Sequence, residues 1–314
     1  MRSSSSERAE ARAQARRLSA TARDAGRLLR IRHWVKNLLV FAPILFSSRL
    51  LEPEALARVA LTFAAFCLCA SGLYIINDIA DREHDRHHPR KRDRPIAAGR
   101  VAVTPAAVLA GVLLAAGLAI ATLTGLAVLC ALAVYVALVV SYSLLFKRYI
   151  VLDVMVLAGG FLIRVIAGGL AVDLPISRWL LLATFFLSLF LGFCKRRHEF
   201  ALDGHDEHRA VLTVYSRELL DIFIVVTVTL AIITYSLYTI DAGTIAKTGT
   251  DALILTIPPV VFGLLRYLYI VYRENSGGDP VAAITHDRPI IAAVIVWVVV
   301  VVTVLHVLGT ETLL

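Results

Sequence analysis

The stretch IINDIADREHDRHHPRKRDRP, residues 75–95, joins the end of a long apolar run to a dense cluster of charged side chains. The preceding run, near residues 55–76, is long enough to cross a bilayer, because a membrane helix needs roughly 20 apolar residues. The stretch itself holds six Lys or Arg residues and five Asp or Glu residues. It therefore predicts a membrane helix that ends in a polar binding region.

The composition of the whole chain is that of a protein with several membrane helices. Of its 314 residues, 58% are hydrophobic and 18% are charged, and the mean hydropathy is +0.75. Soluble domains are less apolar and more charged. We therefore predict an all-α polytopic membrane protein with membrane lipids as partners and no nucleic acid. The apolar runs predict nine transmembrane helices, near 34–50, 55–76, 103–122, 126–146, 151–172, 178–194, 219–240, 252–272 and 289–308.

Lys and Arg residues concentrate in alternate loops, which predicts the orientation. The segments 77–100, 147–148 and 195–217 are basic, and basic loops stay on the cytoplasmic side of a membrane. We therefore expect a cytoplasmic amino terminus, two long cytoplasmic loops and an external carboxyl terminus. Residues 1–33 hold nine Arg against three acidic residues, which predicts a flexible basic tail on anionic headgroups. Residues 34–314 are then the membrane domain.

The acidic residues after the second predicted helix recur at helical spacing. Asn77, Asp81 and Asp85 are four residues apart and share one helix face, with Asp78 beside them. Carboxylates gathered on one face repel each other unless a cation lies between them. Mg²⁺ prefers one or two carboxylates together with the oxygens of a phosphorylated substrate. We predict that Asn77, Asp81 and Asp85 bind Mg²⁺ and that Asp78 supports them.

Two cations a few residues further on fit the same interpretation. Lys91 and Arg94 can contact the phosphates directly, Arg94 through a forked guanidinium contact. Acidic residues for a metal and basic residues for phosphate together predict a diphosphate site. The alternative is a solvated loop whose charges merely keep it out of the membrane, but such loops normally lack fixed spacing.

These residues resemble a known family. NDIADREHD, residues 77–85, fits the NDxxDxxxD motif of the UbiA superfamily of intramembrane prenyltransferases, and KRDRPIAAG, residues 91–99, resembles its KxxRP continuation. The resemblance covers nearly the whole chain after residue 30. It implies a ring of helices around a lipid-accessible cavity, closed by the two cytoplasmic loops, and Mg²⁺ as the cofactor.

The second long loop departs from that family's pattern. The family carries a second acidic motif, DxxxD, where this chain reads CKRRHEFALDGHDEH, residues 194–208. Lys195, Arg196 and Arg197 replace the expected carboxylates, and Glu199 lies one turn past Lys195 as its predicted ion-pair partner. The loop therefore favours an anion bound without a metal, for which a lipid monophosphate is suitable.

This departure resembles one branch of the superfamily, which makes polyprenyl-phosphate phosphoribose. YSLLFKR, residues 142–148, and VLDVMVLAGGFLIRVIAGG, residues 151–169, carry the same resemblance. It implies phosphoribosyl diphosphate as the donor and a polyprenyl phosphate as the acceptor. It also implies a bacterial cell membrane and a product used for arabinose donors of the cell envelope. Tyr142 and Lys147 are expected to position the substrates.

Two charges stand inside the fifth predicted helix. Asp153 and Arg164 share a helix face, and charge within a membrane span marks a functional residue by default. We assign Asp153 to substrate binding, whereas Arg164 either pairs with a structural polar group or contacts the cavity. The glycine pairs at 159–160 and 168–169 fit close helix packing.

For the donor that the resemblance implies, we expect a displacement at the anomeric carbon of the sugar. Mg²⁺, Lys91 and Arg94 stabilise the departing diphosphate. Lys195, Arg196 and Arg197 hold either the acceptor headgroup or the 5-phosphate of the donor.

Two other functions compete with this one. A prenyltransferase of the same superfamily would join a prenyl diphosphate to an aromatic or other small acceptor. A transporter would instead place its site near the midplane on broken helices. The length of the polyprenyl chain and the oligomeric state, including a homo-oligomer, stay open.

Overall fold

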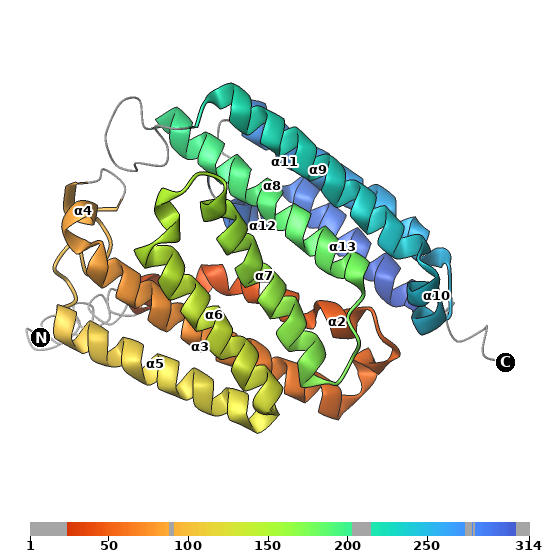
Figure 1. The fold of residues 1–314 in the computed structure, drawn as a ribbon, viewed down its shortest axis with the longest axis horizontal. Helices are drawn as coiled ribbons and strands as arrows, with labels where there is room; N and C mark the ends of the chain where they lie inside the picture. The colour runs from red at the N-terminus through yellow and green to blue at the C-terminus, as the bar shows by residue number, and fades with distance from the viewer. Residues whose placement is uncertain (1–23, 88–90, 203–214, 274–277, 279, 306–314) are drawn as a thin grey trace, which may run out of the picture. The chain divides into compact units, whose positions relative to one another are not determined.

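The computed structural model describes residues 24–87, 91–202, 215–273, 278 and 280–305, and every regular element among them is a helix (Figure 1). The elements are η1 (Ile31–Phe41), α2 (Ala42–Leu45), η2 (Ser48–Leu51), α3 (Pro53–Ala80), α4 (Arg82–His87), α5 (Val103–Thr124), α6 (Leu126–Leu144), η3 (Phe146–Arg148), α7 (Leu152–Ala171), α8 (Arg178–Leu202), α9 (Arg217–Ile240), α10 (Ala242–Thr248), η4 (Ala252–Thr256), α11 (Ile257–Arg273), α12 (Pro280–His286) and α13 (Arg288–Thr303).

Seven helical segments in the described part of the chain are long and apolar enough to cross a membrane. They are α3, α5, α6, α7, α8, α9 and the combined segment η4–α11. Helix α13 is apolar but has only 16 residues. The all-helical membrane architecture is therefore confirmed, whereas the expected count of nine membrane helices is not.

The expectation of one continuous helix over 34–50 is wrong. That segment is divided among η1, α2 and η2. Pro43 stands at the start of α2, where a residue without an N–H is tolerated. Ser47 is extended, with φ −131°, and its hydroxyl accepts a hydrogen bond from the Arg49 N–H at 3.2 Å. A new short helix therefore starts at this cap instead of continuing the previous one.

Two of the helices extend beyond their expected ends. Helix α3 runs to Ala80 and α8 runs to Leu202, whereas the hydropathy pattern had ended them near residues 76 and 194. The charged side chains at these ends therefore stand on regular helix rather than in loops.

The chain forms two compact units, and the division passes through α3 and α5. The smaller unit comprises residues 1–34 and 67–117, and the larger comprises 35–66 and 118–314. In the smaller unit, the core consists of small and branched residues from α3, α5, the segment between α4 and α5 and the residues before η1: Leu28, Ile75, Ile96, Ala106 and Ala110. Burial of Ile96 anchors the loop that carries Lys91 and Arg94.

The larger unit has two apolar clusters along the same helices. One gathers Phe190, Phe193, Ile224 and Tyr267 from α8, α9 and α11, together with residues of α7. The other gathers residues nearer the opposite ends of α7, α8 and α9, with α13. Helices α8 and α9 lie side by side (Figure 1). These two clusters hold the helices that carry the second group of charged residues.

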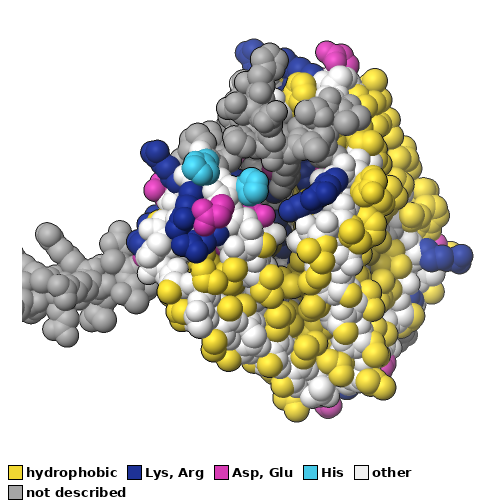
Figure 2. Space-filling view, turned by 60° about the vertical axis from the view of Figure 1, so that its left-hand side comes forward, with side chains coloured by type: hydrophobic (Ala, Val, Ile, Leu, Met, Phe, Trp, Pro, Cys, Tyr) yellow, Lys and Arg dark blue, Asp and Glu magenta, His cyan; other side chains and the backbone are white. Residues whose placement is uncertain are grey.

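Large hydrophobic side chains are also abundant on the outside of the helices. Val108, Val112, Val134, Phe262 and Val299 are each more than half exposed. Figure 2 shows hydrophobic side chains over much of the surface turned toward the viewer. Such surface is expected where lipid tails, rather than water, contact the helices.

Arg164 lies among structural partners within the larger unit. Its side chain is buried, and it donates hydrogen bonds to Asn37 Oδ1 at 2.6 Å, Gly160 O at 2.7 Å and Tyr135 Oη at 2.9 Å. The guanidinium also stacks on the Tyr135 ring at 4.5 Å. Of the two roles left open for Arg164, this geometry favours the structural one, joining η1, α6 and α7.

Close packing between η1 and α7 depends on one glycine. A Cβ atom on Gly168 would lie 1.9 Å from the carbonyl oxygen of Val40, a separation that no real contact allows. A Cβ on Gly159, also in α7, would meet only Leu138 Cδ2 at 3.4 Å. The prediction of close packing therefore holds at Gly168, where only a hydrogen fits.

The substitution Gly168→Ala should destabilise the protein by about 1–3 kcal/mol, because α7 and η1 must separate to admit the methyl group. The matched control Gly159→Ala should be neutral or stabilising by up to about 1 kcal/mol, because Ala favours a helix interior. Thermal unfolding of both variants in detergent measures the difference. Equal melting temperatures would contradict the packing described for Gly168.

Candidate functional site

The first group of charged residues stands where α3 passes into α4. The Asp81 N–H donates to Asn77 O and the Asp85 N–H donates to Asp81 O, both at 2.9 Å. These are helical i→i−4 bonds, so the backbone continues as a helix across the junction. The prediction that Asn77, Asp81 and Asp85 follow one helix face is confirmed.

Arg94 holds two of the carboxylates together. Its Nη1 donates to Asp78 Oδ1 at 3.0 Å and to Asp85 Oδ2 at 2.6 Å. Both aspartate side chains are buried, with 2% and 3% exposure, whereas Arg94 is 27% exposed. In the neighbouring pair, Asn77 Nδ2 donates to Asp81 Oδ2 at 3.0 Å. The repulsion expected within this acidic group is therefore offset by an arginine in the structure.

The backbone of the loop after α4 places Arg94 at this point. The Arg94 N–H donates to Lys91 O at 2.9 Å, so both cations belong to one turn. Pro95 O accepts the N–H groups of Arg100 and Val101, and Gly99 adopts a left-handed φ of +71°. Such a conformation favours glycine. Together these turns close the loop and fix the direction of the Arg94 side chain.

Arg30 is a functional candidate that sequence reasoning missed. It forms an ion pair with Asp78 and lies over the Tyr74 ring at 4.7 Å. The sequence places Arg30 in the predicted basic tail, as one of nine arginines. Its position directly before the apolar residue Ile31 was a signal that Arg30 lies close to the membrane domain. The pairing with Asp78 could not be predicted, because the two residues are 48 positions apart in the sequence.

The oxygen donors at this site fit Mg²⁺. Asp81 and Asp85 supply two carboxylates and Asn77 an amide group on one helix face, and Mg²⁺ needs only one or two protein carboxylates beside substrate phosphate and water. Within the described residues, no three Asp, Glu, His or Cys side chains are grouped as a ready metal cage. The binding of Mg²⁺ by Asn77, Asp81 and Asp85 stays a prediction.

The second group of charged residues lies on the last turns of α8 and not in a loop. Arg196 is only 2% exposed. Its Nε donates to Asp153 Oδ2 at 2.6 Å, its Nη1 to Glu199 Oε2 at 2.5 Å and its Nη2 to Tyr142 Oη at 3.0 Å. Four residues assigned to substrate binding are therefore brought together in one network.

Tyr215 joins the same network. Its hydroxyl donates to Asp153 Oδ1 at 3.1 Å and accepts the Val151 N–H at 2.7 Å. Val151 has a φ of +64°, which is strained for a β-branched residue and needs such support. Burial raises the pKa of Tyr215 above its ordinary value, so the hydroxyl remains protonated as a donor.

Arg197 is held by residues that sequence reasoning missed. Its Nε donates to Asp221 Oδ1 at 2.5 Å, and its guanidinium lies over the Tyr272 ring at 4.2 Å. Tyr272 Oη donates to the same Asp221 oxygen at 2.9 Å. Asp221 is the one charged residue of the predicted span 219–240, and a charge within a membrane span is the signal that points to it.

Lys195 differs from the two arginines in its exposure. Its side chain is 44% exposed, whereas those of Arg196 and Arg197 are 2% and 4% exposed. Its Nζ lies 3.8 Å from Glu199 Oε1, so the predicted ion pair is confirmed. The direct contact of all three cations with phosphate stays a prediction, and Lys195 is the member that an incoming anion can reach.

The remaining residues of the sequence analysis are Lys147 and two aspartates of the second long loop. Lys147 lies half-buried on η3, just after the end of α6 that carries Tyr142. Asp203 and Asp206, the acidic residues of the unusual second loop, lie outside the described residues.

Comparisons with known proteins agree with these motifs. The model of the UbiA prenyltransferase family matches residues 39–286. The chain is 34% identical, over 86% of its own length and 88% of the relative, to the decaprenyl-phosphate phosphoribosyltransferase of Mycolicibacterium smegmatis. It is 32% identical, over 86% and 83%, to the enzyme of that name from Corynebacterium glutamicum.

The fold also resembles solved structures. A UbiA homologue from Archaeoglobus fulgidus, bound to GPP and Mg²⁺, superposes with a TM-score of 0.70 at 20% identity, over 90% of this chain and all of the other. The family match covers well over half of the chain and includes both groups of charged residues. The chain is therefore a member of the UbiA prenyltransferase family.

Proposed function

We propose that the protein transfers 5-phosphoribose from phosphoribosyl diphosphate to a polyprenyl phosphate and releases diphosphate. The observation that carries this proposal is the similarity, along most of both chains, to enzymes named decaprenyl-phosphate phosphoribosyltransferase. The cationic end of α8, where other family members carry a second acidic motif, supports the same assignment. The product would serve as a precursor of arabinose donors for the cell envelope.

The first charged group would bind the diphosphate of the donor. Asn77, Asp81 and Asp85 would hold Mg²⁺, which when bound neutralises the charge that develops on the leaving diphosphate. Lys91 and Arg94, on one turn of the same loop, would contact the phosphate oxygens directly. Asp78 keeps Arg94 in place through their 3.0 Å contact.

The second charged group would bind a phosphate without a metal. Lys195 is the exposed cation of this group, and Glu199, 3.8 Å away, holds its side chain near the end of α8. Arg196 acts as a positioning residue because all three of its donor nitrogens already bind Asp153, Glu199 and Tyr142. The anion is either the acceptor headgroup or the 5-phosphate of the donor.

The chemistry requires no general base. A phosphate monoester has a second pKa of about 6, so the acceptor is mostly a dianion at neutral pH and has no proton to lose. One of its oxygens forms the new bond to the anomeric carbon. The bond from that carbon to the diphosphate oxygen breaks, and the diphosphate leaves with the electron pair. Positive charge that develops on the sugar ring resembles that in other glycosyl transfers.

The proposed placement in the membrane follows from the charges. Besides the seven long helical segments, α13 and the segment over η1, α2 and η2 would complete nine crossings. The amino terminus and both charged groups would face the cytoplasm of a bacterial cell, and the carboxyl terminus the outside. Of the expected basic tail, residues 1–23 would lie on the membrane surface, since Leu28 is buried in the core of the smaller unit and Arg30 pairs with Asp78.

A donor assay tests the proposed function against its nearest rival. Purified protein in detergent with Mg²⁺ receives either labelled phosphoribosyl diphosphate and a polyprenyl phosphate, or a labelled prenyl diphosphate and an aromatic acid. We expect a lipid-soluble labelled product only from the first pair, and its loss when the metal is chelated. Product from the second pair alone would replace the proposal with prenyl transfer.

Removal of one carboxylate tests the assignment of the first charged group. Asp81→Asn should lower kcat/KM by on the order of 100-fold, because the charge that stabilises the metal and the leaving group is lost. The control Asp93→Asn changes an exposed aspartate in the same segment and should retain full activity. Steady-state kinetics at several Mg²⁺ concentrations measures both, and equal activity of the two variants would refute the assignment.

Two substitutions on one turn of α8 separate binding from positioning. Lys195→Gln should raise the KM for one phosphate substrate about tenfold without a change in melting temperature, because an exposed charge is lost. Arg196→Gln should instead lower the free energy of unfolding by about 3–5 kcal/mol, because Asp153 remains buried without its cation. Kinetics and thermal unfolding are compared with Arg217→Gln, an exposed control on α9. If Arg196→Gln melts like the control, Arg196 is not a positioning residue.

A further inference from the structure

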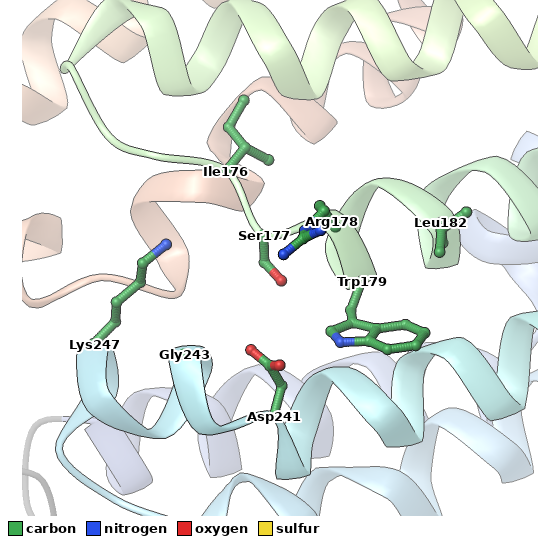
Figure 3. Close-up of a pocket in the computed structure, with 8 residues that line it drawn as sticks. All are labelled: Ile176, Ser177, Arg178, Trp179, Leu182, Asp241, Gly243 and Lys247. Atoms are coloured by element: carbon green, nitrogen blue, oxygen red, sulfur yellow. The ribbon is translucent and has the colours of Figure 1, made fainter.

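A cavity lies at the start of α8, the end opposite Lys195. It has a volume of about 660 Å³ and lies where α8 begins, beside the junction of α9 and α10. Charged, polar and aromatic side chains line it together: Ser177, Arg178, Trp179, Asp241 and Lys247, with Ile176, Leu182 and Gly243 completing the wall (Figure 3). None of these residues takes part in the proposed transfer reaction.

The cavity lies at the depth of lipid headgroups. Arg178 and Lys195 are separated by about 25 Å along α8, close to the hydrocarbon thickness of roughly 30 Å. Since Lys195 stands near one membrane face, Arg178 stands near the other. Trp179 is the residue type that anchors helices at a membrane interface. Leu182 lies one turn further into α8 and is 40% exposed, which gives the cavity an apolar side toward the acyl chains.

Opposite charges face this cavity without pairing with each other. Arg178 is exposed, and it has no hydrogen bond or ion pair with any residue in the described ranges. Asp241 uses its Oδ2 to accept the Thr244 N–H at 3.0 Å, which caps α10. In Figure 3 the Asp241 carboxylate and the Ser177 hydroxyl point toward one another across the cavity. A cation and an anion that share one cavity without contact leave room for a ligand that bridges them.

Lys247 adds a second positive charge on the rim. Its Nζ donates to Pro175 O at 3.0 Å, which holds the ammonium group beside the loop that precedes α8. Two cations and one carboxylate around one cavity match a ligand with a phosphate and a primary ammonium group. The phosphate would contact Arg178 and Lys247, and the ammonium would donate hydrogen bonds to Asp241.

We propose that this cavity binds the headgroup of a phosphoethanolamine phospholipid, with an acyl chain along Leu182. An anionic headgroup without an ammonium would leave the Asp241 carboxylate facing another negative charge. A choline headgroup cannot donate hydrogen bonds to Asp241. The site is independent of the transfer reaction, so its test reads lipid binding and not activity.

Native mass spectrometry of the delipidated full chain in detergent tests the proposal. Phosphatidylethanolamine, phosphatidylglycerol and phosphatidylcholine with identical acyl chains are added separately. We expect phosphatidylethanolamine to be retained about tenfold more than the other two, the size of effect that one charge-assisted contact gives. Glycerophosphoethanolamine, the headgroup without chains, should bind weakly, and binding equal to that of the lipid would overturn the assignment to a lipid.

Two variants and a control locate the binding. Arg178→Gln and Asp241→Asn should each remove the preference for phosphatidylethanolamine. Asn still supplies a side-chain oxygen that caps α10, so Asp241→Asn retains the fold. Arg49→Gln changes an arginine of η2 that pairs with Glu52; this variant is the matched control and should bind like the wild type. Equal retention of the three lipids by the wild type, or unchanged preference in both cavity variants, would overturn the proposal.

Discussion

The ion pair between Arg196 and Asp153 is the interaction on which the larger unit depends. A charge buried in a membrane span is tolerated only when it is paired and its hydrogen bonds are satisfied. Arg196 meets this requirement with partners on α6, α7 and its own helix, and Tyr215 satisfies the other oxygen of Asp153. The helix ends near the second charged group are thus fixed by one guanidinium. Lys195 is the next residue to Arg196 on α8, so its backbone is held by the same contacts while its side chain stays exposed.

The smaller unit faces the same electrostatic problem, because the side chains of Asp78 and Asp85 are also buried. Arg94 and Arg30 both contact Asp78, and Arg94 also contacts Asp85. These contacts tie the loop after α4 to the helix before it. Compact turns around Pro95 and the buried side chain of Ile96 complete that connection. Each unit therefore presents polar groups from a scaffold that is itself held by charge pairing.

Local features of both groups were predictable from the sequence. The spacing of Asn77, Asp81 and Asp85 and the pair Lys195–Glu199 follow from helical periodicity alone, because their partners are one turn away. The pairing of Arg196 with Asp153 spans 43 residues and that of Arg30 with Asp78 spans 48. Nothing in a single sequence specifies such pairings. The prediction of one continuous helix over 34–50 was wrong for a different reason. Hydropathy measures how apolar a segment is, whereas caps such as Ser47 decide where a helix begins and ends.

The contact of Arg94 with both Asp78 and Asp85 affects how the metal and the donor would bind. An Asp85 oxygen that accepts from Arg94 cannot at the same time be given fully to a metal ion. Under the proposed reaction, Asp85 would exchange its contact with Arg94 for the metal, and Arg94 would keep its contact with Asp78 while its other N–H groups face a new anion. The diphosphate supplies that anion. Metal and donor would then bind cooperatively, each raising the affinity for the other, because both draw on the same displacement of Arg94 from Asp85.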